Sequence, residues 1–262
     1  IVHAAVETIE WGKVAPVVGD MGLIQDVVNA LEDPEEYIRA SGAQALVSIV
    51  GHADQDVVRA VVDCSELDAA HLRALIGDSE AFVRRAALEL VLSMSKKGAS
   101  QEWLQALTYE DLYQLADNPD FEVRVRLARV LARLSELLFL QSECSVDLQY
   151  IEELQPGTLL IDMCRDSSRY VRRVCLDSLT GMKGNLEAAG VSASKKEQTK
   201  RRAVVSSQAS FYSKLCEIDF ARLEAGLTTE HLYQEALDTQ VEDELMQETG
   251  ERNQGNNILE CY

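Results

Sequence analysis

The sequence predicts an all-α protein, a solenoid of stacked helical repeats with a flexible C-terminal tail. One residue pattern recurs four times, at intervals typical of helical-repeat proteins. Apolar residues before and after each copy recur at offsets of three, four and seven, the spacing of one helical face. No segment sustains the alternation of apolar and polar residues that a half-buried strand shows.

The recurring pattern is an Asp or Asn six residues before an Arg, with an aliphatic residue directly before that Arg. Its copies are DPEEYIR (33–39), DSEAFVR (78–84), NPDFEVR (118–124) and DSSRYVR (166–172). The steps from Arg to Arg are 45, 40 and 48 residues, so loops of variable length separate the copies.

Each copy opens a helix and follows another one. The helix after the pattern has small or apolar residues on one face: Gly42, Ala43 and Leu46; Ala87, Leu88 and Val91; Leu127, Ala128 and Leu131; Cys175, Leu176 and Leu179. The helix before the pattern has the stripes Ile24, Val27, Val28 and Leu31; Leu72, Leu75 and Ile76; Leu112 and Leu115. Ser65 with Asp68, and Thr108 with Asp111, are spaced as capping pairs for two of these first helices. The unit is therefore helix, turn, helix.

This unit resembles the HEAT repeat in its period of roughly 40 to 47 residues and in the Asp and Val-Arg pattern of its second helix. The resemblance covers about residues 20 to 182, with Asn118 in place of one Asp and without the usual proline of the first helix. It implies a HEAT-repeat α-solenoid over residues 1–183. We expect the pattern residues to bridge neighbouring repeats: Asp33, Asp78, Asp166, Arg39, Arg84, Arg124 and Arg172.

Beyond the solenoid we expect a basic mobile loop (184–210), C-terminal helices (211–247) and an extended tail (248–262). The loop holds Lys195, Lys196, Lys200, Arg201 and Arg202, which act either as a nuclear-import signal or as a solvated surface.

Charge and composition favour protein partners. There are 44 acidic and 25 basic residues, a net charge of −19, which repels nucleic acids and anionic membranes. No apolar run approaches the ~18 residues that cross a bilayer. The six cysteines show no disulfide framework, so we expect a reducing compartment, the cytoplasm or the nucleus. Because the sequence starts at Ile1, we expect it to be a fragment that lacks an N-terminal part.

Motifs for intrinsic catalysis are weak. The four histidines form no metal-binding motif, so we expect no enzyme activity and no cofactor of the chain's own. An arginine stripe (Arg126, Arg129 and Arg133, with Arg169 and Arg173) has helical spacing. We expect these arginines to pair with carboxylates of stacked repeats.

The tail, Ile258, Leu259, Glu260, Cys261 and Tyr262, is the strongest candidate site. Ile258 and Leu259 form an apolar anchor after a polar linker. Cys261 supplies a thiolate and Tyr262 a carboxylate, and both are zinc ligands. The pair therefore fits a zinc centre, mononuclear or dinuclear, held by a partner enzyme.

Together, the acidic repeats and this ending resemble the family of BRCA-associated ATM activator proteins. The resemblance implies binding to the Integrator complex's RNA endonuclease, a two-zinc metallo-β-lactamase enzyme, with the tail at the zinc site. The enzyme's inactive paralogue and DNA-damage kinase factors are further candidate partners, in the cytoplasm and the nucleus. The alternative is an adaptor in DNA-damage kinase signalling whose tail is inert.

Overall fold

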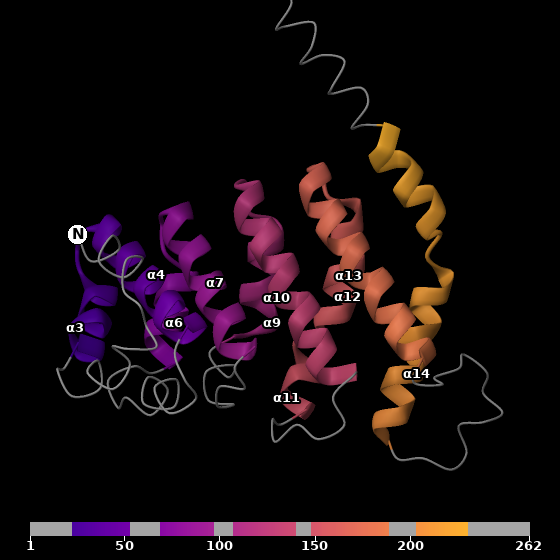
Figure 1. Cartoon of the computed structure of the whole chain (residues 1–262), viewed down its shortest axis with the longest axis horizontal. Helices are drawn as coiled ribbons and strands as arrows, with labels where there is room; N and C mark the ends of the chain where they lie inside the picture. Colours follow the sequence, from indigo (N-terminus) through magenta and orange to yellow (C-terminus); the bar gives the residue numbers. More distant parts are fainter. Residues whose placement is uncertain (1–22, 53–68, 97–106, 140–147, 189–202, 230–262) are drawn as a thin grey trace, which may run out of the picture. The chain divides into compact units, whose positions relative to one another are not determined.

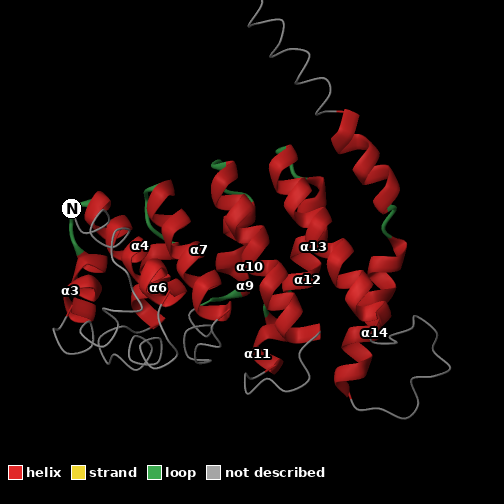
Figure 2. Cartoon of the chain, viewed as in Figure 1, coloured by secondary structure: helices red, strands yellow, loops and turns green. Residues whose placement is uncertain are grey.

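The computed structural model describes residues 23–52, 69–96, 107–139, 148–188 and 203–229. All regular structure in these ranges is helical (Figure 2). The chain divides into two units, Ile1–Ile218 and Asp219–Tyr262.

Within the described residues of the first unit, four pairs of helices follow one another (Figure 1). Their elements are α3 (Leu23–Asn29) with η1 (Ala30–Glu32) and α4 (Glu36–His52); α6 (Ala69–Ile76) and α7 (Ala81–Lys96); α9 (Tyr109–Ala116) and α10 (Phe121–Phe139); α12 (Pro156–Asp162) with η2 (Met163–Arg165) and α13 (Arg169–Ala188). The second helices form one contacting series, α4 with α7, α7 with α10 and α10 with α13. The predicted helix-turn-helix unit is confirmed for these four pairs.

The fourth repeat has one more helix than the sequence predicted. α11 (Leu148–Glu153) precedes α12 and contacts α10. Its Ile151 is fully buried, and the Tyr150 hydroxyl donates to the Leu107 carbonyl at the start of the third repeat. The six-residue α11 is too short to show a helical stripe in the sequence, and for that reason it was missed.

The predicted apolar faces form the core. All the stripe residues of the first helices are at most 8% exposed, as are those of the second helices. Gly42 lets α4 approach η1 closely, since a Cβ there would lie 3.1 Å from side-chain atoms of Ala30 and Leu31. The absence of a side chain at Gly42 therefore permits the close contact of these two elements.

The predicted capping box at Thr108 and Asp111 is confirmed. The Asp111 N–H donates to Thr108 Oγ1 at 3.1 Å, and the Thr108 N–H donates to Asp111 Oδ2 at 3.2 Å. These contacts satisfy N–H groups that the first turn of α9 leaves free. The other predicted pair, Ser65 with Asp68, lies outside the described residues.

Helices extend into both ends of the segment that the sequence predicted to be a loop. α13 continues through residues 184–188, held by the buried Leu186, and α14 (Ala203–Glu217) starts before residue 210. Residues 189–202, with the basic cluster, lie outside the described residues. α14 packs onto the fourth repeat, where Phe211 touches Gly157. In the second unit, residues 220–229 are helical, and the Asp219 carboxylate accepts from the Arg222 N–H.

Candidate functional site

A ladder of Arg and Asp side chains joins consecutive turns. Arg39 donates to both carboxylate oxygens of Asp78, at 2.8 and 3.2 Å, and Arg124 does the same to Asp166, at 2.7 and 2.9 Å. Each Arg also donates from Nη1 to two carbonyls of its own turn. The two-pronged guanidinium matches the carboxylate, which fixes the orientation of one repeat on the next. The predicted bridging role is thus confirmed for these two pairs.

The turn residues also cap the second helices. Side-chain oxygens of Asp33, Asp78, Asn118 and Asp166 accept a backbone N–H two residues later, at 2.7–3.0 Å. Burial is the largest single effect on Asp78 and raises its pKa, yet the hydrogen bonds from Arg39 and the Glu80 N–H bring that pKa below its ordinary value. The carboxylate therefore stays ionised in its structural role.

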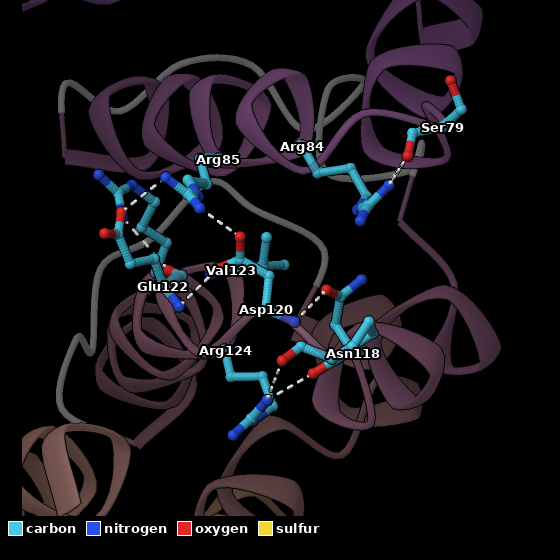
Figure 3. Close-up of polar contacts among 10 residues, drawn as sticks. Ser79, Arg84, Arg85, Asn118, Asp120, Glu122, Val123 and Arg124 are labelled. Carbon is cyan, nitrogen blue, oxygen red and sulfur yellow. Dashed lines mark hydrogen bonds and ion pairs between the residues drawn. The ribbon is translucent and has the colours of Figure 1, made fainter. Parts of the chain in front are cut away.

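The ladder is interrupted between the second and third repeats (Figure 3). Arg84 donates to the carbonyls of Asp78 and Ser79 in its own turn, at 2.5 and 2.8 Å. Its buried Nε has no hydrogen-bond partner in the described part of the chain. The next repeat offers Asn118, which lacks the carboxylate, so the predicted bridge from Arg84 is wrong.

Arg85 joins these two repeats instead. Its guanidinium contacts the carboxylate of Asp120, and Nη1 lies 2.9 Å from Glu122 (Figure 3). Burial, the largest effect on Asp120, raises its pKa, but the hydrogen bonds from Arg85 and from backbone N–H groups lower it overall. A search for the recurring pattern could not reveal this pair, because Arg85 lies one position outside it.

The predicted pairing of the arginine stripe with a stacked repeat is confirmed for Arg126 and Arg129, whereas Arg133 and Arg173 pair within their own helices. Arg126 and Arg129 of α10 lie 3.2 and 3.8 Å from Glu89 of α7, and Arg133 lies 3.2 Å from Glu136. Arg173 pairs with Asp177 on its own helix at 3.0 Å. Since these guanidinium groups are engaged, the stripe is a structural feature of the stack.

Two hollows lie beside the Arg–Asp pairs that join consecutive turns. One, of about 460 Å³, is lined by residues around Arg39 and Asp78, including His71. The other, of about 780 Å³, surrounds Arg124 and Asp166 and is lined also by Tyr113, Asp162 and Arg165. In both hollows the Arg and Asp of the ladder form part of the lining.

The described ranges hold thiols, but no cluster of side chains that could bind a metal ion. They contain no group of three or more His, Cys, Asp or Glu side chains that could hold a metal ion. The thiols of Cys164 and Cys175 are buried and share a hydrogen bond, which raises the pKa of Cys175 together with its burial. No helix in these ranges is long and apolar enough to cross a bilayer. The predicted tail site, Ile258 to Tyr262, lies outside the described residues.

Comparison with known proteins agrees on the fold. No model of a known protein family and no curated protein matches the chain. Among solved structures, a designed armadillo repeat protein in complex with the peptide (KR)4 is 16% identical, with a TM-score of 0.55 over 82% of this chain and 89% of that one. A second designed armadillo repeat protein is 15% identical, with a TM-score of 0.55 over 82% of this chain and 91% of that one. The chain is an all-α repeat solenoid similar to these proteins.

Proposed function

We propose that the chain is a non-enzymatic scaffold that binds the Integrator RNA endonuclease and places its C-terminal tail at the zinc site of that enzyme. The observation that carries the proposal is the combination of a stacked-repeat fold with Ile258, Leu259, Cys261 and Tyr262 at the end of the sequence. Repeat solenoids offer long binding surfaces, and the similar designed armadillo protein is complexed with a peptide. The resemblance to the BRCA-associated ATM activator family supports the choice of partner.

The chemistry of the last two residues supports zinc as the target. A free thiol titrates near pH 8.5, so binding of Cys261 to zinc releases a proton. A thiolate prefers zinc to oxygen-seeking ions such as Mg²⁺. In our proposal Tyr262 supplies the C-terminal carboxylate, a group that is ionised at neutral pH and binds without that cost. Affinity should therefore rise with pH between about 6 and 8.

The test measures affinity of the chain for the purified endonuclease subunit. Deletion of Cys261 and Tyr262, the substitution Cys261→Ser, and addition of one residue after Tyr262 should each weaken binding at least about tenfold. Ile258→Asp and Leu259→Asp test the apolar anchor, and Asn256→Ala in the polar linker is the matched control. Unchanged affinity after deletion would favour the adaptor with an inert tail.

A further inference from the structure

Aromatic side chains line the turn edge of the solenoid, where the second helices begin. In the first, second and fourth repeats the residue four positions after the turn Asp is aromatic, namely Tyr37, Phe82 and Tyr170, and in the third repeat Phe121 precedes that position by one. Tyr37, Phe121 and Tyr170 are 69%, 42% and 53% exposed. Side chains this exposed do not belong to the buried core of the repeats.

These aromatic residues stack in two platforms across repeat boundaries. Tyr37 and Phe82 lie 5.1 Å apart between ring centroids at 17°, and Phe121 and Tyr170 lie 5.6 Å apart at 29°. Stacking contributes to the stability of the stack. However, stacking covers only the face that each ring turns toward the other. The outward faces of the rings stay available for another contact.

The second platform already holds an arginine of the chain. The guanidinium carbon of Arg169 lies 4.9 Å from the centroid of the Tyr170 ring, and its Nη2 donates to the Tyr170 hydroxyl at 3.1 Å. This is the geometry of a cation–π contact. Arg169 stands three positions after its turn Asp, directly before the ring.

The first platform has the opposite charge at the same position. Glu36 stands where Arg169 stands in the fourth repeat, and Glu35 and Glu80 precede the two rings by two residues. In the described part of the chain, neither Glu35 nor Glu80 forms an ion pair, and both are exposed. The platform thus presents aromatic faces and free carboxylates together, without a cation of its own.

We propose that the Tyr37–Phe82 platform binds an arginine side chain from an extended peptide of a partner protein. The guanidinium stacks on the exposed ring face and donates to Glu35 or Glu80, which reproduces with a foreign arginine the contact that Arg169 makes within the chain. Arginine suits this site better than lysine because its planar group stacks and donates at the same time. The net charge of −19 draws basic segments toward this surface. The proposal is independent of the tail and of the endonuclease.

The test is a titration of the full chain with the acetylated and amidated peptide GSGRGSG, followed by NMR. Counterparts with lysine or citrulline in place of arginine keep the length and, for lysine, the charge. The arginine peptide should bind about tenfold more tightly than the citrulline peptide, and more tightly than the lysine peptide. Tyr37→Ala, and separately Glu35→Lys with Glu80→Lys, should each weaken arginine binding about tenfold. Tyr113→Ala is the control, since Tyr113 is 55% exposed but lies on α9.

Three outcomes would overturn the proposal. The first is equal binding of the arginine and citrulline peptides. The second is unchanged binding by Tyr37→Ala, whether or not that variant has a lower melting temperature. The third is equal loss of binding in Tyr113→Ala, which would indicate general attraction to an acidic protein. Each leaves the proposed role of the tail untouched, because the endonuclease is absent from the experiment.

Discussion

At the scale of single residues, Asn118 is the position where the ladder lacks a carboxylate. Arg84 faces it with a buried Nε that has no hydrogen-bond partner in the described part of the chain. Asp78 and Asp166 each accept a backbone N–H in the turn and also bind the Arg of the preceding repeat. Asn118 makes only the first of these contacts. At the boundary between the second and third repeats, Arg85 and its two carboxylates therefore supply the ion pair that the ladder lacks, beside the pairs of Arg126 and Arg129 with Glu89.

Asn118→Asp should stabilise the protein. The new carboxylate keeps the cap to the Asp120 N–H and completes the bridge from Arg84, as Asp166 does for Arg124. We expect a gain of about 1 kcal/mol, at the lower end for a charged hydrogen bond because Asp117 and Asp120 flank the site. Thermal unfolding measures it, with Asp166→Asn as the reciprocal variant that should lose about 1.5–3 kcal/mol. If Asn118→Asp unfolded at a lower temperature than the wild type, Asn118 would be more stable at this position than a carboxylate bridged to Arg84.

The Arg39–Asp78 pair should make the free energy of unfolding depend on pH in the acid range. The pKa of Asp78 is lower in the folded chain than the ordinary value near 3.9, so the unfolded chain binds the proton more tightly. The stabilisation is complete above about pH 5 and is lost as pH falls below about 4 toward the folded pKa. The difference in unfolding free energy between the wild type and Asp78→Asn should accordingly be constant from pH 7 to 5 and shrink below pH 4. A difference that grows below pH 4 would contradict this sign.

At the scale of elements, α14 packs tightly on α12 where Phe211 contacts Gly157. A Cβ on Gly157 would lie 2.5 Å from Cε2 of the buried Phe211 ring. Gly157 lies in α12, two residues after Gln155, whose backbone is in the left-handed region (φ 47°). The glycine therefore permits the close approach of the two helices.

Gly157→Ala should loosen α14 selectively. The ring has to move away from α12, at a cost of about 1–3 kcal/mol typical of overpacking. Hydrogen exchange should accelerate in α14 while α7 and α10 keep their protection. Combining Gly157→Ala with Phe211→Leu, which removes the clashing ring edge, should restore part of the protection. Equal acceleration in α7 would mean that the stack and α14 open as one unit.

The sequence predicted the repeated elements well because their signals are local. Core stripes such as Leu112 and Leu115 follow helical spacing, and the capping box from Thr108 to Asp111 is a four-residue pattern. The short α11 and the pairing of Arg85 with Asp120 were missed, since the first is too brief for periodicity and the second joins residues 35 positions apart. The stacked platforms were missed for the same reason, as each ring belongs to a different repeat.

At the scale of the whole molecule, a set of charged side chains in the described part of the solenoid joins neighbouring repeats. The Arg–Asp pairs of the ladder, Arg85 and the arginine stripe are engaged within the stack. In our two proposals, the surfaces that bind partners are the Tyr37–Phe82 platform and the tail. The tail residues Ile258 to Tyr262 lie outside the described ranges, so their predicted role stays a prediction.

Zinc X-ray absorption of the complex with the endonuclease tests the central proposal most directly. If Cys261 binds the metal, the spectrum contains a sulfur neighbour at about 2.3 Å, and the complex with Cys261→Ser lacks it. Asn256→Ala should leave the signal unchanged. A complex that forms with full affinity and gives the same zinc spectrum for the wild type and Cys261→Ser would contradict the account.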